Sequence, residues 1–433
     1  MAAAWELAEQ GHAVTIYERS GVFGGLASGF PLGDQSGVFL DKFYHHIFRS
    51  DTDIIALIHR MGLAHRLEWH ADKSCIFAHG REWALQRPWD ILRCRPIGSV
   101  ADRLRFAYAS YRLQSARDWR HLDSLTCGEF YKEAGAENGY RNFWSPLLAA
   151  KFGRQGQDAP AAFLWGRIVA RRGSNSDPMG RLPIGYLRGG FQRLIDRVVD
   201  CLAGRANCEL RNGETVQEVW LNDFSSVSVR TARGVFEYDW VISTIPLTIL
   251  AGLVKGADPD LLNELRSVEY MAAVCLILRL NERLTDYYWT NVLDPELSMG
   301  VVIEHTNLVP IEDYGATHVV YVANYLPQGH PWLRAKLNDI FAIHSDSLSR
   351  MYNRWKPKSV VNMRLIRAGI ATPIYRRGHG RLAARLAQCR PLGRIWLADM
   401  TQVYPEDRNM SHCIRLGARV ARMAMAEAAA RRS

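Results

Sequence analysis

The chain opens with a helical run of apolar positions followed by a strand-like one. Residues 2–10 have helical spacing, Gly11 ends the run, and an apolar strand over 14–17 closes in the acid Glu18. This order is typical of the second half of a dinucleotide-binding βαβ unit. The glycine-rich turn and first strand of such a unit would stand before Met1. We therefore expect an N-terminally truncated unit, with upstream in-frame codons for the missing part.

The rest of the chain alternates between helical and strand-like zones. Residues 51–201 are mainly helical in pattern. Short strands are expected over 209–211, 215–221, 226–231 and 235–245, and a larger sheet over 271–280 and 300–325. A strand over 393–399 precedes a helix over 414–430. This interleaving predicts an α/β fold of two intertwined domains: a cofactor domain from residues 1–50, 196–265 and 370–433, and an α+β substrate domain from 51–195 and 266–369.

Composition places the chain among soluble globular proteins. It has 433 residues, of which 48% are hydrophobic, and a mean hydropathy of -0.16. The longest mostly apolar stretch, over 241–254, is shorter than the ~20 residues that span a bilayer. The first residues carry no basic signal-peptide region, so we expect a cytoplasmic protein. Eight scattered cysteines without a Cys-x-x-Cys pair predict reduced thiols and no metal site.

The net charge of +10 is spread along the chain, and no nucleic-acid motif accompanies it, so no nucleic-acid partner is expected. Residues 81–120 differ, because Arg recurs there among Trp, Leu and Tyr. A basic amphipathic helix in this stretch could make a peripheral contact with the inner membrane. It could equally be a substrate-domain helix with a solvated basic face.

Polar residues at the ends of two expected strands indicate a nucleotide site. Glu18 ends the first strand, where a carboxylate accepts hydrogen bonds from ribose hydroxyls. Gly24 and Gly25 follow closely and let the backbone approach a ligand. Asp399 ends the last strand shortly before a helix start near Ser411. This junction suits ligand hydroxyls and phosphates, or is a simple helix cap.

In their order along the chain, these motifs resemble the FAD-binding frame of one superfamily. It holds flavin amine oxidases, protoporphyrinogen oxidase, phytoene-desaturase-type enzymes and UDP-galactopyranose mutase. The resemblance implies a Rossmann-like, glutathione-reductase-like fold with FAD as cofactor. The matching segments are Val-Thr-Ile-Tyr-Glu18, Gly24-Gly25-Leu26-Ala27, Glu214-Thr-Val216, Val241-Ile-Ser-Thr244-Ile-Pro246 and Leu397-Ala-Asp399.

The resemblance also implies roles for these residues. Glu18 would bind the adenosine ribose, Val216 would contact adenine through its backbone, and Asp399 would bind the ribityl–pyrophosphate region. The segment Arg408-Asn409-Met410-Ser411 would place backbone N–H groups near the flavin pyrimidine. The remaining expected cofactor contacts are Gly24, Gly25, Leu26, Ala27 and Thr244. Two positions depart from the family pattern: Val22 replaces the usual Arg, and Ala398 the usual Gly.

The middle of the chain is similar to a bacterial subgroup that is associated with sugar and cell-surface biosynthesis. We therefore expect a small-molecule substrate, with a sugar- or lipid-linked compound as one interpretation. The segments that carry this likeness are Asp41-Lys-Phe-Tyr-His45-His46-Ile-Phe, Pro146-Leu-Leu-Ala-Ala-Lys151-Phe-Gly153, Tyr288-Trp-Thr-Asn291 and Ile303-Glu304-His305-Thr-Asn307.

Five residues are candidates for the chemistry of substrate oxidation. His45 and His46 follow the glycine turn, where a neutral imidazole could accept a substrate proton, and strand alternation would aim at most one of them into the site. Lys151 lies among apolar residues and could bind an anionic group or extend to solvent. His305 and Asn307 share one face of an expected strand, the face that we assign to the cavity.

The favoured function is an FAD-dependent oxidoreductase that oxidises or desaturates an organic substrate by hydride transfer to flavin N5. One alternative is a non-redox flavin enzyme similar to UDP-galactopyranose mutase. Another is a flavin-free lipid or protein binder of the same fold, as the Rab GDP-dissociation inhibitors are. The sequence identifies neither the substrate, nor the electron acceptor, nor the oligomeric state.

Overall fold

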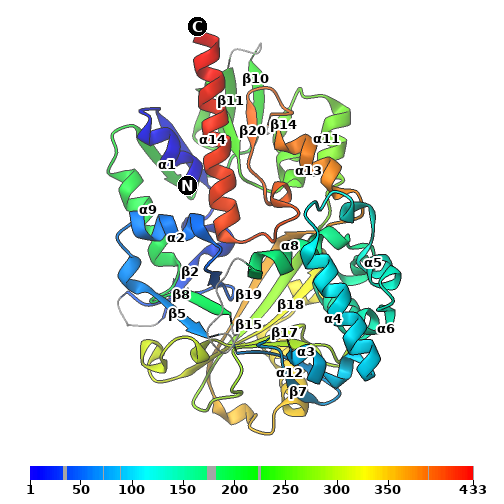
Figure 1. Ribbon diagram of the computed structural model, residues 1–433. Coiled ribbons are helices and arrows are strands. Elements are labelled where there is room, and N and C mark those ends of the chain that lie inside the picture. Colours follow the sequence, from blue (N-terminus) through cyan, green and yellow to red (C-terminus); the bar gives the residue numbers. More distant parts are fainter. Residues whose placement is uncertain are drawn as a thin grey trace.

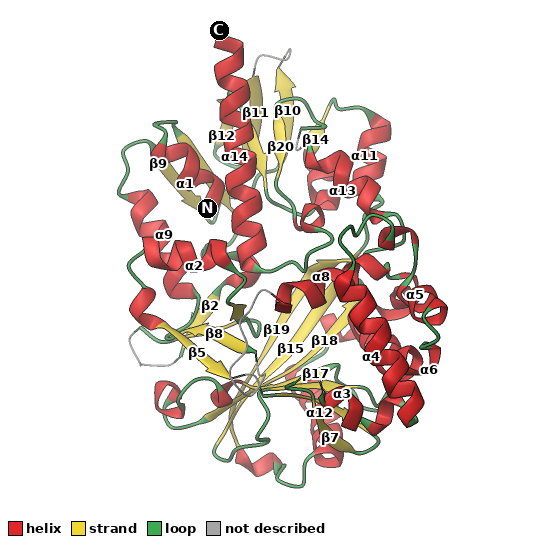
Figure 2. Cartoon of the chain, in the orientation of Figure 1, coloured by secondary structure: helices red, strands yellow, loops and turns green. Residues whose placement is uncertain are grey.

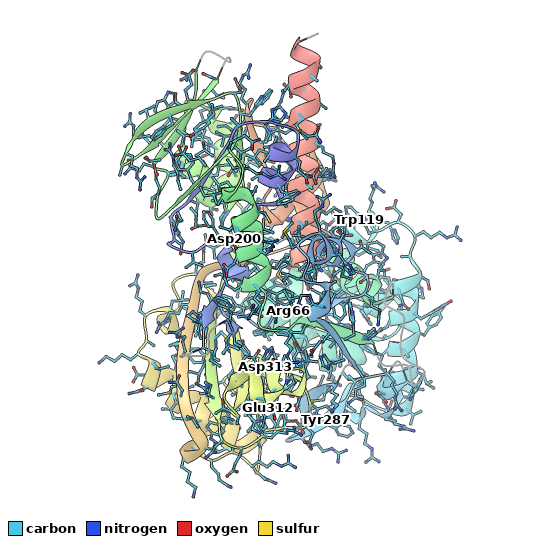
Figure 3. All side chains as sticks on the ribbon, turned by 90° about the vertical axis from the view of Figure 1, so that its left-hand side faces the viewer. Arg66, Trp119, Asp200, Tyr287, Glu312 and Asp313 are labelled. Carbon is cyan, nitrogen blue, oxygen red and sulfur yellow. The ribbon has the colours of Figure 1, made fainter. Side chains whose placement is uncertain are left out.

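The computed structural model describes residues 1–32, 37–71, 73–87, 89–172, 182–222, 226–388 and 390–432. Its helices and strands form two lobes, one above the other in Figure 1. The colours show that the upper lobe combines segments from the start, middle and end of the sequence. Figure 3 shows the two lobes from the side, with Glu312 and Asp313 in the lower one. The mixed α/β character expected from the sequence is confirmed.

The N-terminal unit has the expected helix and strand. Helix α1 (Ala2–Glu9) precedes β1 (Val14–Glu18), which pairs in parallel with β9 (Cys208–Asn212). Helix α14 (Met410–Arg432) runs beside α1 (Figure 1). The two helices pack closely because small residues meet there: a Cβ on Gly417 would lie 3.4 Å from the Cβ of Ala2.

The strand zone after residue 208 divides between two sheets. Strands β12 (Gly234–Tyr238), β11 (Ser226–Thr231), β10 (Glu218–Asn222) and β14 (Val254–Lys255) form one sheet in that order. Strand β13 (Val241–Ser243) pairs in parallel with β20 (Ile395–Leu397). The single strand expected over 235–245 is therefore wrong, because β12 and β13 belong to different sheets and the chain must turn between them.

The lower lobe is built on a seven-stranded sheet with the order β19-β15-β18-β17-β16-β6-β7. Its long pair β15 and β18 is antiparallel, with all but one residue of β15 and six of the ten residues of β18 buried. The strands are β19 (Val360–Pro373), β15 (Tyr270–Leu280), β18 (His318–Pro327), β17 (Val301–Glu304), β16 (Trp289–Val292), β6 (Ser74–Ala78) and β7 (Arg81–Ala84).

The region 51–201 contains more strands than its pattern predicts. Strand β6 pairs with β16, and β8 (Pro183–Leu187) pairs with β4 (Ile47–Phe48) and β5 (Leu67–Ala71). These strands are short and their partners are distant, so local periodicity could not reveal them. The pairing of β4 with β8 also crosses an expected domain boundary, and the exact boundaries remain a prediction.

The stretch 81–120 is not one helix. It contains β7, α3 (Asp90–Arg93) and α4 (Val100–Ser115). Pro96 and Gly98 separate α3 from α4, and Ser99 starts α4 with a capping box to Asp102. No helix in the described part of the chain is long and apolar enough to cross a membrane.

The remaining elements are one small antiparallel sheet of β2 and β3 and a set of helices, which Figure 2 shows in red. They are β2 (Gly29–Pro31), β3 (Phe39–Asp41), α2 (Thr52–Arg60), α5 (Cys127–Glu133), α6 (Glu137–Gly139), α7 (Ser145–Phe152), α8 (Ala161–Arg172), α9 (Gln192–Ala203), α10 (Leu247–Leu253), α11 (Pro259–Arg266), α12 (Leu337–Met351) and α13 (His379–Ala387).

Candidate cofactor and substrate site

The loop after β1 contains two glycines with positive φ. Gly24 has a φ of 113°, and a Cβ there would lie 2.6 Å from Cδ1 of Ile195. Gly25 has a φ of 56°, and no atom lies within 4 Å of its Cβ position among the described residues. The backbone of Gly25 therefore borders open space, as a close approach to a ligand requires. Leu26 and Ala27 complete the short helix that follows.

Three further expected cofactor contacts lie in the upper lobe. Glu18 ends β1, and its Oε1 accepts a hydrogen bond from the Ser20 N–H at 2.7 Å. Thr244 is exposed directly after β13. Val216 lies just before β10 rather than inside the expected strand, since β10 begins at Glu218. The backbone of Val216 is thus outside the strand ladder, as an adenine contact through the backbone requires.

Asp399 is a buried carboxylate of which only one oxygen accepts hydrogen bonds from described residues. Its Oδ1 accepts hydrogen bonds from the N–H and the hydroxyl of Thr401. Its Oδ2 is buried and has no hydrogen-bond partner among the described residues. Burial raises the pKa of Asp399 to about 6, and the hydrogen bonds from Thr401 oppose this shift. Because a buried acceptor needs a donor, Oδ2 suits a ligand hydroxyl.

Side chains hold the start of α14 in place and leave the N–H groups of Met410 and Ser411 for a ligand. The Asn409 amide donates to Asp51 at 2.7 Å and accepts from the His412 N–H at 2.8 Å. The Ser411 hydroxyl accepts from the Asp53 N–H at 3.2 Å. The first N–H groups of a helix have no partner within the helix, so those around Met410 can bind an anionic or carbonyl oxygen. The backbone role expected for residues 409–411 stays a prediction.

The glycine loop meets the large sheet where the two lobes join. Leu26 packs in one cluster with Phe43, Tyr325 and the small residues Ala273, Ala368 and Ala371. Tyr325 belongs to β18, and its hydroxyl accepts a hydrogen bond from Arg408 Nη2 at 3.0 Å. Arg408 in turn lies two residues before α14. The expected cofactor loop, the helix start and the end of the substrate sheet therefore converge on one place.

Three cations surround one carboxylate at this junction. Lys151 of α7 lies 3.4 Å from Asp407 Oδ1, and Arg167 of α8 lies 2.5 Å from Asp407 Oδ2. Arg408 is the third cation, and its buried Nε has no hydrogen-bond partner among the described residues. The side chains of Arg167 and Asp407 each remain 31% exposed, and that of Lys151 15%. The group therefore has an excess of positive charge that a ligand can reach.

For both Lys151 and Asp407, burial and the neighbouring charges shift the pKa in opposite directions. Burial lowers the pKa of Lys151 to about 7, although Asp407 opposes the shift. Burial opposes ionisation of Asp407, but Arg167, Lys151 and Arg408 together hold the pKa of its carboxyl well below the usual range. Asp407 is therefore ionised at neutral pH, whereas Lys151 is close to half protonated.

His45 and His46 have different environments, but neither lies in a strand, so the expected strand alternation does not account for the difference. Burial, and then the charge of Arg408, lowers the pKa of His45 to about 4, so its imidazole is neutral at pH 7. Nδ1 of His45 is buried and has no hydrogen-bond partner among the described residues. His46 instead contacts Tyr288 through Nδ1 at 3.1 Å and packs against Trp289. His45 therefore belongs to the Arg408 group.

The assignment of His305 and Asn307 to the cavity is wrong. The expected strand ends at Glu304, and both residues lie in a short 3-10 helix, so strand alternation does not apply to them. His305 is buried and its Nε2 lies 2.8 Å from the hydroxyl of Tyr314. The Asn307 amide donates to the backbone carbonyls of Thr285 and Tyr287. Both side chains thus stabilise the lower lobe.

Sequence reasoning missed Arg167, Tyr325 and Asp407. Asp407 directly precedes the segment expected at the flavin pyrimidine, so its position was an available signal. Arg167 and Tyr325 carry no such signal, because an Arg in a helix and a Tyr in a strand are ordinary residues. Only the fold brings them to Lys151.

The residues at this junction fit the expected FAD. An unpartnered buried oxygen on Asp399, an open backbone at Gly25 and the N–H groups of Met410 and Ser411 at the start of α14 are what a ligand with ribityl hydroxyls and a pyrimidine ring requires. The cationic group beside them suits an anionic substituent. A neutral imidazole at His45 supplies a proton acceptor.

Comparison with known proteins agrees with this interpretation. The family model for flavin-containing amine oxidoreductases matches residues 1–422. No curated protein matches the sequence at a significant level.

Solved structures of the same fold cover nearly the whole chain. A candidate protoporphyrinogen oxidase from Exiguobacterium sp. 255-15 superposes with a TM-score of 0.77 at 15% identity, covering 98% of this chain and 96% of that one. Reduced UDP-galactopyranose mutase superposes with a TM-score of 0.74 at 16% identity, covering 98% and 93%. A putrescine oxidase variant superposes with a TM-score of 0.71 at 14% identity, covering 98% and 96%.

Proposed function

Because the chain belongs to the flavin-containing amine oxidoreductase family, we propose that its junction site oxidises a small organic substrate that carries an anionic group. The protein is an FAD-dependent oxidoreductase. The observation that supports the substrate class is the group of Lys151, Arg167 and Arg408 around the single carboxylate of Asp407.

Charge decides between an anionic and a cationic substrate. Two unit charges about 5 Å apart in an effective dielectric of about 20 interact by about 3 kcal/mol. One unbalanced positive charge at this distance therefore disfavours a protonated amine by roughly a factor of a hundred, and favours a carboxylate or phosphate by a similar factor. The excess charge thus argues for a substrate different from a free amine.

The residues of the chain have distinct tasks in this proposal. FAD supplies a hydride acceptor at N5 when it is bound. Lys151 and Arg408 bind the anionic group and fix the distance of the reacting carbon from the glycine loop. His45, which is neutral at pH 7, accepts the proton that leaves the substrate. Leu26 and Tyr325 exclude water from the junction.

A mutase-type reaction is the second candidate, because the same cationic group suits the phosphate of a sugar nucleotide. UDP-galactopyranose mutase shares the fold, but at 16% identity this likeness shows the fold alone and says nothing of the reaction. The two candidates differ in electron flow, since an oxidase consumes one acceptor per product and a mutase consumes none. The family match favours the enzyme over the flavin-free binder.

The test uses the purified holoprotein under anaerobic conditions. Carboxylated or phosphorylated compounds and the matching amines are added in turn, and flavin absorbance is followed. The proposal predicts that an anionic compound bleaches the flavin absorbance and that the amount of oxidised product equals the amount of reduced flavin. Bleaching only by amines would contradict the substrate class, and product without acceptor consumption would support the mutase reaction. A colourless, folded protein would contradict both.

A further inference from the structure

Helix α4 exposes an apolar face that the fold does not cover. Val100, Leu104, Tyr108 and Tyr111 follow the three- and four-residue spacing that places side chains on one helix face. Each of the four is between 55% and 66% exposed. The buried residues of α4, among them Phe106, face the protein core. The helix is therefore apolar toward the solvent as well as toward the protein.

The exposed face continues onto α3. Trp89 and Leu92 are 46% and 43% exposed, α3 packs against α4, and Arg103 of α4 donates a hydrogen bond to the Leu92 carbonyl. We call the six residues Trp89, Leu92, Val100, Leu104, Tyr108 and Tyr111 the α4 patch. Of the eleven large hydrophobic residues exposed in the described part of the chain, these six lie within one short segment. Such clustering marks an interaction surface, whereas single exposed residues do not.

The rim of the α4 patch is basic. Arg93, Arg95, Arg105 and Arg112 are exposed, and none forms a salt bridge with another described residue. The acids nearby are already engaged. Asp102 accepts hydrogen bonds from Ser99 as part of the helix cap, and the buried Asp90 accepts from backbone N–H groups of the preceding turn. These hydrogen bonds do not remove the charge of the two carboxylates, but the four arginines outnumber them, so the rim carries a net positive charge.

An apolar face with Trp and Tyr, bordered by Arg, has the composition of a helix that lies in the headgroup region of a membrane. The arginines can bind lipid phosphates while the apolar side chains enter the boundary of the acyl chains. A symmetric contact between two copies is disfavoured, because it would place arginine against arginine. Figure 1 shows α4 on the right-hand side of the lower lobe, with α3 beside it.

We propose that the α4 patch docks the protein peripherally on an anionic lipid bilayer. This inference does not depend on the substrate of the junction site. It uses only the exposure of the patch and the charge of its rim.

The test is co-sedimentation of the full holoprotein with vesicles of phosphatidylcholine alone or mixed with phosphatidylglycerol. The wild-type protein is expected to bind the mixed vesicles at least about tenfold more tightly than the neutral ones, and to be released by salt. The double variant Leu104→Glu/Tyr108→Glu should lose about tenfold or more in affinity for the mixed vesicles. Val361→Glu changes an equally exposed apolar residue outside the patch and should bind as the wild type does.

Circular dichroism melting confirms that each variant is folded, and Arg105→Gln/Arg112→Gln provides a second test that leaves the apolar face intact. Equal binding to neutral and anionic vesicles, or undiminished binding by both double variants, would overturn the proposal. So would a wild-type protein that stays in solution but forms dimers that Leu104→Glu/Tyr108→Glu abolishes, because the patch would then bind a second copy.

Discussion

Lys151 Nζ lies 3.4 Å from Asp407 Oδ1, although the two residues are 256 positions apart in the chain. Arg167 binds the other oxygen of the same carboxylate. One acid thus fixes two cations from two different helices of the lower lobe, immediately before the helix start that is expected to meet the flavin. This arrangement ties the proposed substrate-binding cations to the helix start of the cofactor domain.

Asp407→Asn is expected to destabilise the protein. The substitution leaves Lys151, Arg167 and Arg408 close together without the charge that offsets their repulsion, so we expect a loss of about 2 to 4 kcal/mol in the free energy of unfolding. Urea denaturation at pH 7 measures this loss. Asp118→Asn is the matched control, because Asp118 is an exposed carboxylate with one ion pair to Arg120. Equal stability of both variants would show that the cations near residue 407 do not repel one another.

Lys151→Met should weaken anion binding and remove its pH dependence. Since the pKa of Lys151 is lowered to about 7, the ammonium form that attracts anions is present below pH 7 and is lost as the pH rises above it. Sulfate affinity of the holoprotein, measured through the perturbation of flavin absorbance, should therefore fall as the pH rises through about 7. In Lys151→Met the affinity should be about tenfold lower at pH 6 and nearly constant with pH. Lys132→Met, on the exposed side of α5, should retain the wild-type profile.

The sequence predicts the elements of the cofactor lobe well, because each follows from a local pattern. Strand β11 has the expected limits, and β1 ends at Glu18 as expected. The division of residues 235–245 between two sheets could not be predicted, since it depends on β20, which lies about 150 residues further along the chain.

The candidate catalytic residues show the same limit. Strand alternation does not explain the difference between His45 and His46, because β4 begins only at Ile47 and neither residue lies in a strand. The same reasoning failed for His305, where a 3-10 helix replaces the expected strand. Lys151 stood out as a charge among apolar residues, but its partners could be identified only in three dimensions.

Gly24→Ala is expected to disturb the cofactor loop. The new Cβ would lie 2.6 Å from Ile195 Cδ1, and a φ of 113° is strained for any residue with a Cβ. We expect a loss of about 1 to 3 kcal/mol in the free energy of unfolding and weaker retention of FAD through gel filtration. Gly21→Ala tests the specificity of this effect, because no atom lies within 4 Å of its Cβ position among the described residues. If Gly21→Ala is equally harmful, the loop does not depend on the close approach at Gly24.

His45→Gln should slow flavin reduction by the substrate by about a hundredfold without changing substrate affinity, because the substitution removes the proposed proton acceptor. Burial keeps the pKa of His45 at about 4, so the wild-type rate should not titrate with this residue between pH 6 and 8. Stopped-flow absorbance measures the rate. His46→Gln is the control, since His46 contacts Tyr288 instead of Arg408. Equal slowing in both variants would indicate a shared structural role.

Asp399→Asn tests whether the unpartnered oxygen of this carboxylate binds FAD. Asn keeps the shape and one acceptor oxygen, and that oxygen can satisfy Thr401, but an NH₂ group replaces the Oδ2 acceptor and can only donate. A ligand hydroxyl that donates to Oδ2 loses its acceptor, so the FAD dissociation constant should rise by about ten- to a hundredfold. Titration of deflavinated protein with FAD measures this change.

The same carboxylate should make FAD binding depend on pH. Burial raises the pKa of Asp399 to about 6, so the carboxylate is protonated and becomes a weaker acceptor as the pH falls through this value. Wild-type FAD affinity should therefore decrease below pH 6, while that of Asp399→Asn stays level. The exposed Asp239→Asn should match the wild type in both measurements. Unchanged FAD affinity in Asp399→Asn would show that the buried oxygen has another partner.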